Sequence, residues 1–470
     1  MPRSPERANP PAEPDPRAPT TAADDAWRRA VAELIERVQA WRAGERGLLR
    51  AAVPIPQGDP LAWLEANPLA PRCYWQDRDG GRQIAGLGAA WRMRADGAAA
   101  YRSLLEGAQR LAGEAGVPVL SAFAFDGRSG EAEEWAGFPA ALALLPAVAL
   151  ETAAEGQQLA AHLHARDEAE LRRQRSGLLG LLRALRPAEA AEAAEPPRIV
   201  ARQETPGRAE HRARINALLD DIEQGRIQKA VPARRVALQL DRPLPAFATL
   251  RRWSALAGGS YTFAIEHAGR IFMGCSPERL FRRSGRRVET ESLAGTVRRG
   301  EGPAADAELA ASLREDPKLV REHGWVTRYI RSELEPWATE VEAPAEAGVL
   351  KLDRIQHLQL PIRAVLRPGV GDAELLEALH PTPAVCGFPR QPAQALIARR
   401  EGFQRGWYSG VVGLLTGDGA ELAVAIRSAL VGAEQAWCYS GAGVVQGSEP
   451  EAEWQELEAK IETFLAAVHG

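Results

Sequence analysis

From residue 212 to the C-terminus, segments with helical spacing alternate with short strand-like segments, and no segment repeats at a fixed period. Apolar residues at three- and four-residue intervals indicate helices, and alternation with a period of two indicates strands. The expected helices are 212–223, 304–314, 320–334 and 372–379, and the expected strands are 261–266, 270–273, 408–415, 421–428 and 435–439. This irregular order predicts a large mixed α+β domain.

The first 200 residues carry weaker signals. A helix is expected over 26–50, a hairpin with its turn at Asp79-Gly80-Gly81, a second helix over 98–115 and a strand in VLSAFAFDG. Residues 151–195 are rich in Ala, Arg, Glu and Leu, which predicts a helix with His162 and His164 on its surface, followed by a loose connector. The connector is either a linker or a connection between two halves of one sandwich. We divide the chain into a disordered tail at 1–25, an N-terminal part at 26–200 and a catalytic region at 201–470.

Composition excludes several classes of protein. The chain has 470 residues, 45% of them hydrophobic and 26% charged, which is typical of a globular protein. A net charge of -4 with interspersed signs gives no basic stripe for a nucleic acid. The four cysteines form no CxxC pair, and no apolar run is long enough for a membrane span or a signal peptide. We therefore expect a cytoplasmic protein whose partner is a small molecule.

A turn of small residues near the C-terminus precedes an acidic segment. The backbone amides of Ser440-Gly441-Ala442-Gly443 can meet an anion, and Glu453 and Glu456 share one face of the predicted helix that follows. Carboxylate pairs of this kind suit a hard cation such as Mg²⁺. The alternative is a solvated acidic helix in which Glu456 and Lys460 form an ordinary ion pair.

Five segments together resemble one family: IQKAVPARR, SPERL with VETESLAGTVRRG, KLVREH, HPTPAVCGFP, and RGWYSGVVG through AIRSAL to the small-residue turn. They resemble the chorismate-utilising enzymes, and most closely the isochorismate synthases of the menaquinone type. The resemblance is strong from residue 212 onward and weaker before it. It implies an α+β fold like that of anthranilate synthase component I, with two large antiparallel sheets packed as a sandwich, helices outside, and an active site in a cleft at the sheet edges.

The resemblance implies two catalytic residues. Lys229 matches the lysine that activates water for attack on the ring, where aminating relatives carry glutamine and use ammonia. Glu278 matches the general acid that protonates the departing ring hydroxyl, which requires a raised pKa. Without the family, Lys229 would be a charge at a helix end and Glu278 a surface glutamate.

The same resemblance implies the residues that hold the substrate, chorismate, which carries two carboxylates. Ala294 stands where some relatives carry a lysine that forms a covalent adduct, so that route is closed here. Leu360 stands shortly after His357, where relatives usually carry a threonine that lines the site. The substrate-binding residues are expected to be Gly295, Thr296, His357, Tyr408, Arg427, Gly441, Ala442, Gly443 and Lys460.

For the metal, the resemblance implies a Mg²⁺ ion on Glu322 and Glu456, with Glu453 as a water-mediated or more distant partner. His323, next to Glu322, is more typical of a packed or hydrogen-bonded histidine, so we leave it out of the metal set.

The favoured activity is reversible isomerisation of chorismate to isochorismate. The alternatives are a salicylate synthase, which also eliminates pyruvate, and a silent chorismate-binding subunit. Lyases of this fold tend to carry threonine in the segment where this chain has Ala384. No glutaminase subunit is needed when water is the nucleophile. A monomer or a homodimer, and a product used for menaquinone or for a siderophore, all remain open.

Overall fold

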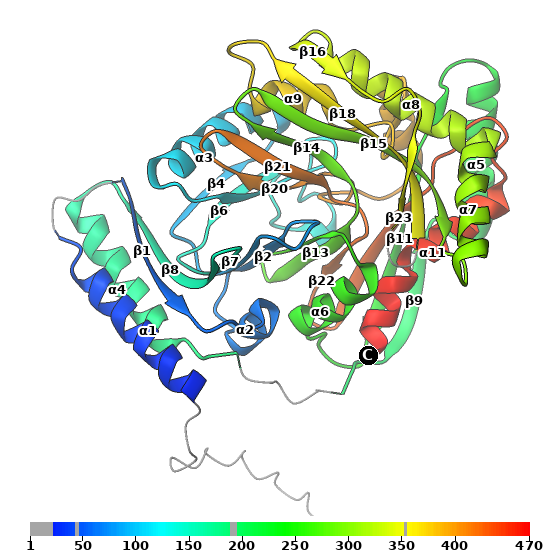
Figure 1. The fold of residues 1–470 in the computed structure, drawn as a ribbon. Helices are drawn as coiled ribbons and strands as arrows, with labels where there is room; N and C mark the ends of the chain where they lie inside the picture. Colours follow the sequence, from blue (N-terminus) through cyan, green and yellow to red (C-terminus); the bar gives the residue numbers. More distant parts are fainter. Residues whose placement is uncertain (1–21, 43–46, 189–194, 352–354) are drawn as a thin grey trace, which may run out of the picture.

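The computed structural model describes residues 22–42, 47–188, 195–351 and 355–470. Two large antiparallel sheets pack against each other, and helices cover their outer faces (Figure 1). The predicted α+β sandwich is therefore confirmed. Among the described residues, no helix is long and apolar enough to cross a membrane. All four cysteines are buried and free.

Each sheet combines strands from both parts of the chain. The first sheet has eleven strands in the order β1 (Gly47–Ile55), β8 (Gly156–Ala165), β7 (Val148–Ala153), β3 (Gln83–Leu87), β2 (Arg72–Gln76), β12 (Tyr261–His267), β13 (Arg270–Ser276), β22 (Ser428–Val431), β23 (Gln435–Gly441), β11 (Ala233–Leu240) and β9 (Ile199–Thr205). Strands from before and after residue 200 meet where β2 pairs with β12. This topology agrees with the view that 151–195 connects two halves of one sandwich.

The second sheet runs in the order β16 (Ala338–Glu342), β18 (Ile355–Leu366), β15 (Arg287–Arg298), β14 (Arg279–Ser284), β21 (Gly419–Val424), β20 (Val411–Leu415), β5 (Val119–Phe123), β6 (Ala141–Leu145) and β4 (Trp91–Ala95), with β17 (Gly348–Lys351) also paired to β18. A separate two-stranded pair joins β10 (Lys229–Ala230) to β19 (Gly387–Phe388). Pro232 lies between β10 and β11, a break that suits a residue without an amide hydrogen.

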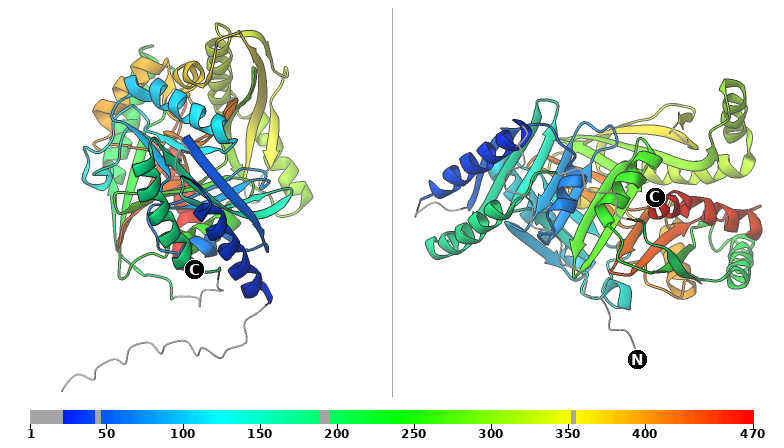
Figure 2. Two further views of the ribbon diagram at one scale, coloured as in Figure 1. Left: turned by 90° about the vertical axis from the view of Figure 1, so that its left-hand side faces the viewer. Right: turned by 90° about the horizontal axis from the view of Figure 1, so that it is seen from below.

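Helices cover the two outer faces (Figures 1 and 2). The first sheet carries α1 (Ala22–Gln39), α2 (Pro60–Ala66), α4 (Glu168–Ala184), α6 (Ala246–Ala257) and α11 (Pro450–His469). The second carries α3 (Tyr101–Ala115), α5 (Arg208–Glu223), α8 (Pro317–Leu334), α9 (Asp372–Leu379) and α10 (Arg390–Arg400), while α7 (Pro303–Glu315) packs on α8 and β15.

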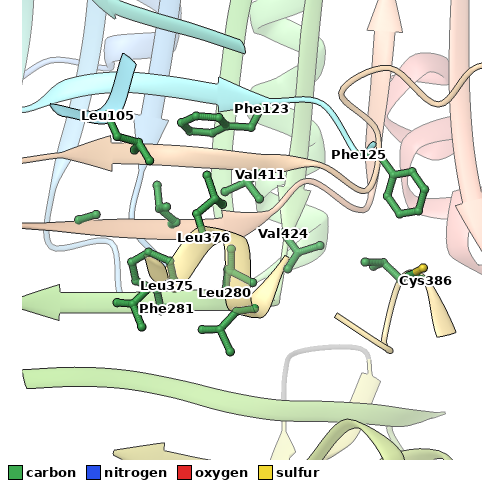
Figure 3. Close-up of a cluster of buried hydrophobic side chains, with 14 of the residues drawn as sticks. Leu105, Phe123, Phe125, Leu280, Phe281, Leu375, Leu376, Cys386, Val411 and Val424 are labelled. Atoms are coloured by element: carbon green, nitrogen blue, oxygen red, sulfur yellow. The ribbon is translucent and has the colours of Figure 1, made fainter. Parts of the chain in front are cut away.

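Three apolar clusters hold these layers together. One lies between the sheets and includes Trp75 and Phe263 from the first sheet and Val412 and Leu414 from the second. The other two lie under the helices on each outer face. Figure 3 shows part of the cluster where β5, β14, β20 and α9 meet. Strands buried on both faces read as nearly continuous apolar runs, as ALALL in β6 does.

Two predictions for the N-terminal part are wrong. The predicted helix at the start of 151–195 is a strand pair, β7 and β8, followed by α4, and His162 is buried with a ring nitrogen 3.0 Å from Pro146 O. Leu159, Ala161 and Leu163 alternate toward the outer cluster, so tertiary burial outweighed the helix propensity of the alanines. The helix predicted over 26–50 ends at Gln39, and β1 follows.

The N-terminal boundary also differs. Helix α1 begins at Ala22, inside the predicted tail, and buries Trp27 and Leu34 against the first sheet. Residues 1–21 of that tail lie outside the described residues. The hairpin of β2 and β3 is confirmed, with paired residues from Arg72 opposite Leu87 to Gln76 opposite Gln83.

Candidate active site

One cavity gathers most of the predicted site. It lies where the β13–β14 junction, β15, β18 and the end of β23 meet helices α8 and α11. Small or apolar residues complete its wall, among them Ala384 and Leu293. The predicted residues that line it are Glu278, Gly295, Glu322, His357, Tyr408, Arg427, Gly441, Glu456 and Lys460.

Lys229 lies directly behind this wall. Its backbone is fixed by β10, since Lys229 pairs with Phe388 and the next residue, Ala230, forms a bridge with Val444. The side chain has no exposed surface, and Nζ is 3.1 Å from Glu322 Oε1. This contact is an ion pair without a well-directed hydrogen bond.

Glycine at position 443 is required by these two side chains. A Cβ there would lie 2.1 Å from Glu322 Oε1 and 3.1 Å from Lys229 Cε. Any larger residue would therefore push the ion pair apart. The small-residue turn thus serves first as space for Lys229 and Glu322. The neighbouring Ala442 amide already donates to Pro232 O at 3.3 Å.

Glu278 follows β13 and is 5% exposed. Burial raises its pKa to about 8, the Glu291 carboxylate adds to that shift, and Lys229 and Lys460 oppose it. A carboxyl group with this pKa keeps its proton near neutral pH, so Glu278 is able to donate it.

The charge that faces Glu278 is itself held firmly. The carboxylate of Glu291 on β15 accepts hydrogen bonds from Arg78 Nη1 at 2.5 Å and from Gln359 Nε2 at 2.6 Å. Arg78 also donates to Pro277 O at 3.0 Å, which ties the β2–β3 turn to the residue before Glu278. Glu291 stands in the motif VETESLAGTVRRG, but only tertiary structure brings it and Arg78 to Glu278. Sequence reasoning missed both residues.

The three predicted metal ligands are each paired with a lysine. Glu322 pairs with Lys229 as described, Glu453 Oε1 lies 2.6 Å from Lys318 Nζ, and Glu456 Oε1 lies 2.7 Å from Lys460 Nζ. In the described parts of the chain, no three His, Cys, Asp or Glu side chains are gathered closely enough to hold a metal ion. The expected Glu456–Lys460 ion pair is present, but it lies in a cavity and not on a solvated helix face.

Lys318 lies among these carboxylates. Burial acts to lower the pKa of Lys318, but the carboxylates of Glu453, Glu456 and Glu322 together act more strongly in the other direction. Its pKa is therefore raised above the ordinary value. For Glu453 the balance is reversed: burial outweighs Lys318 and the nearby Ser448, and its pKa is raised. Glu453 has no exposed surface, and its Oε2 has no hydrogen-bond partner among the described residues. Lys318 begins the quoted motif KLVREH, but sequence reasoning did not single it out.

The pKa of Glu456 is shifted in the opposite direction to that of Glu453, although burial and a lysine act on both. Burial acts to raise its pKa, but the Lys460 ammonium outweighs burial and the pKa is lowered. Glu456 is therefore ionised near neutral pH.

Basic groups also line the cavity, next to Glu456. Lys460 Nζ donates to Gly441 O at 2.7 Å, and Arg427 Nη1 donates to Lys460 O at 3.2 Å. Arg427 has φ +48°, and Ser409, next to Tyr408, has φ +57°. Left-handed backbone at non-glycine residues is costly and clusters at functional sites. The region offers Arg427 and Lys460 to an anionic ligand.

The remaining predicted residues are placed as follows. Burial and the charge of Arg427 lower the pKa of His357 to about 3, so its ring is neutral. Thr296 pairs with His357 across β15 and β18, and its side chain lies outside the described residues. His323 is buried with Nε2 3.1 Å from Ser292 O, so it is a packed and hydrogen-bonded histidine, as expected.

Comparison with known proteins identifies relatives over nearly the whole chain. Residues 30–469 match the family described as chorismate binding enzyme. The isochorismate synthase MenF of Bacillus subtilis is 30% identical over 432 residues, which cover 88% of this chain and 91% of the relative. The salicylate biosynthesis isochorismate synthase of Pseudomonas aeruginosa is 32% identical over 438 residues, 90% of each chain.

A plant relative and a solved structure extend this comparison. The chloroplastic isochorismate synthase of Catharanthus roseus is 38% identical over 271 residues, and this chain spans 47% of its length. The structure of MenF, the menaquinone-specific isochorismate synthase from Escherichia coli, superimposes with a TM-score of 0.84 at 27% identity, covering 95% of this chain and all of that one.

Proposed function

We propose, from the premise that this chain belongs to the family of chorismate binding enzymes, that it is an isochorismate synthase. The reaction would be the reversible conversion of chorismate to isochorismate by addition of water and loss of the ring hydroxyl. One observation carries this proposal: a fully buried lysine, Lys229, shares a site with Glu278, a carboxyl group whose pKa is about 8. The pair supplies a base for water and an acid for the leaving group.

In the proposed step, Lys229 first loses the proton that it carries in the ion pair with Glu322. Its amine then takes a proton from water while the water oxygen bonds to the ring carbon beside the carboxylated carbon. The ring double bond shifts, and the carbon–oxygen bond to the original hydroxyl breaks. Glu278 gives its proton to that oxygen, so a second water molecule leaves. Lys229 ends as an ammonium and Glu278 as a carboxylate, and proton exchange with solvent restores both.

The basic side of the cavity would hold the enolpyruvyl carboxylate. Arg427 and Lys460 supply two fixed positive charges, and the Tyr408 hydroxyl lies beside Gly441, 3.0 Å from where a Cβ would be. Charge-assisted hydrogen bonds of this kind orient a ligand as well as bind it. The ring of His357, which is neutral, lines the same cavity, where a polar group of the substrate would lie.

The carboxylate side would hold Mg²⁺ on Glu322 and Glu456, with Glu453 nearby. Two features support the fit: the donors are oxygen anions, and the buried Glu453 Oε2 has no hydrogen-bond partner among the described residues. When bound, the ion would neutralise the ring carboxylate, which otherwise repels an oxygen nucleophile. The three lysines paired to these carboxylates must then give up part of their present contacts.

Product analysis tests the proposal. Purified protein is incubated with chorismate and MgCl₂, and the products are separated by chromatography. Isochorismate alone supports the proposal. Salicylate with pyruvate would indicate the lyase, anthranilate formed with ammonia would indicate an aminating enzyme, and unchanged chorismate would indicate a silent subunit.

The use of the product follows from the relatives only in outline. One relative is named for menaquinone and another for salicylate biosynthesis. The proposal therefore includes two uses of isochorismate, the synthesis of menaquinone and the synthesis of a siderophore. We further propose that the enzyme works in the cytoplasm without a glutaminase subunit, as a monomer or a homodimer.

A further inference from the structure

Lysine is rare in this chain, and its distribution is uneven. The sequence has four lysines among 58 lysine and arginine residues. Three of the four, Lys229, Lys318 and Lys460, each pair with one of the three glutamates proposed to hold the metal. The fourth, Lys351, pairs with Asp306 at 2.7 Å and belongs to another part of the structure. Arginine serves nearly every other cationic position, so these sites use an ammonium where the rest of the chain uses a guanidinium.

The two cations differ in how readily they leave a carboxylate. A guanidinium binds a carboxylate through a rigid fork of two hydrogen bonds, whereas an ammonium is a compact and strongly hydrated point charge on a flexible stem. An ammonium therefore resembles a small metal cation more closely and is the easier of the two to exchange for one. Lys229 and Lys460 also serve the proposed base and substrate contacts. Lys318 has no such role in the proposed reaction.

The position of Lys318 does not stabilise its own helix. Pro317 and Lys318 are the first two residues of α8, where the positive end of the helix dipole disfavours a cation. The cap of that helix is made by the Asp316 side chain, which accepts from the backbone amides of Lys318 and Leu319. The Lys318 side chain is free of this task. It crosses instead to α11 and meets Glu453 at 2.6 Å.

Glu453, the partner of Lys318, is a buried carboxylate that a nearby cation stabilises. Glu453 has no exposed surface, and Lys318 is the cation whose ammonium contacts it. An unpaired buried carboxylate would be costly, so a positive charge is needed here when no metal is bound. The Lys318 side chain is 23% exposed, which gives it a way to solvent when it is replaced.

We propose that Lys318 is an exchangeable counter-ion, which neutralises the Glu453 side of the carboxylate cluster in the metal-free enzyme and is displaced when Mg²⁺ binds. This inference rests on the proposed magnesium site. Lys318 therefore competes with the metal, so its removal should strengthen Mg²⁺ binding and not weaken it. It is a positioning residue, because it acts on the carboxylates and not on the substrate.

The test measures Mg²⁺ binding directly, by calorimetry with MgCl₂ at constant ionic strength and without chorismate. Lys318→Met should lower the Kd at least about tenfold, which corresponds to about 1.4 kcal/mol. Lys318→Arg keeps the charge and adds a second hydrogen bond, so its Kd should equal or exceed that of the unchanged enzyme. Lys351→Met is the matched control, since it removes a lysine from a carboxylate pair of similar length, 2.7 Å against 2.6 Å, and its Kd should not change.

Thermal unfolding provides a second readout that a purely structural role would not reproduce. Without metal, Lys318→Met should unfold at a lower temperature than the unchanged enzyme because Glu453 is left unpaired. With saturating MgCl₂ that difference should disappear. Equal destabilisation with and without metal, or a Kd that is unchanged or raised in Lys318→Met, would overturn the inference.

The outcomes also separate this inference from the proposal beneath it. If the unchanged enzyme binds no Mg²⁺, the magnesium site fails and the exchange fails with it. If the unchanged enzyme binds Mg²⁺ and Glu456→Gln weakens that binding, the magnesium site stands. A Lys318→Met protein that then binds no more tightly overturns the exchange alone.

Discussion

Two glutamates that line one cavity, Glu278 and Glu456, have pKa values shifted in opposite directions. Burial raises the pKa of Glu278 to about 8, and the carboxylate of Glu291 adds to this shift. Glu456 faces the ammonium of Lys460, and its pKa is lowered although burial acts in the other direction. Burial acts to raise the pKa of both residues. At Glu278 burial prevails over the two lysines, with Glu291 adding to it, whereas at Glu456 the contact with Lys460 outweighs burial.

The largest expected effect comes from Lys229, which pairs with Glu322 and acts on the pKa of Glu278. Lys229→Gln removes the proposed base, so turnover of chorismate should fall at least about a hundredfold. Initial rates measured by chromatography check this, with a thermal melt to confirm folding. Lys351→Gln is the matched control and should keep normal turnover. A rate within tenfold of normal in Lys229→Gln would remove Lys229 from the mechanism.

Glu278 should give a nearly equal loss with a distinct pH signature. The acid works only while protonated, so kcat/KM should decline as pH rises past about 8. Glu278→Gln should lower kcat/KM by roughly a hundredfold to ten-thousandfold, and the residual activity should lack that decline. A variant that keeps the alkaline decline would show that another group causes it.

The same shift affects stability. The folded protein holds the Glu278 proton more tightly than the unfolded chain does, where the pKa is near 4.5. Its contribution to the free energy of unfolding is therefore complete at low pH and lost as pH rises from about 4.5 to about 8. Unfolding in urea over this range should show a weaker pH dependence in Glu278→Gln.

On the other side of the comparison, Glu456→Gln should raise the MgCl₂ concentration needed for half-maximal activity at least about tenfold, since ligand changes weaken metal affinity strongly. The control is Glu458→Gln on the same helix, whose carboxylate pairs with Arg202 and Arg234. An identical magnesium titration in both variants would exclude Glu456 from the metal set.

The smallest expected effect is a shift in the pH dependence of kcat/KM caused by a change at Glu291. Glu291→Gln removes the charge that faces Glu278, so the alkaline decline in kcat/KM should move to lower pH by up to about one unit. Glu289→Gln on the same strand is the control, because Glu289 is half exposed and pairs with Arg279 at 3.7 Å. If both pH profiles stay in place, Glu291 does not tune the acid.

Much of the fold and most of the site were predictable from the sequence. The helices predicted over 304–314, 320–334 and 372–379 coincide with α7, α8 and α9 to within three residues. The predicted strand 421–428 instead covers β21 and the connection to β22, and the long strands β15 and β18 were not predicted. Nine of the predicted residues line one cavity because they stand in motifs at strand ends and on two helices. The family resemblance supplied their roles, which no periodicity reveals.

The failures have physical causes. Strand β8 reads as a helix because its alanines favour one, and only pairing with β1 and β7 explains its conformation. Arg78 lies 213 residues from its partner Glu291, and Lys318 lies 135 residues from Glu453. Long-range charge partners leave no local signal in the sequence. They required the folded structure.

The most direct test of the central claim follows the oxygen atom. The enzyme is given chorismate and MgCl₂ in water enriched in oxygen-18, and the product is analysed by mass spectrometry at the earliest times. The account predicts isochorismate that carries one labelled oxygen in its new hydroxyl group, and none formed by Lys229→Gln. Isochorismate without label, or labelled product formed at a normal rate by Lys229→Gln, would contradict it.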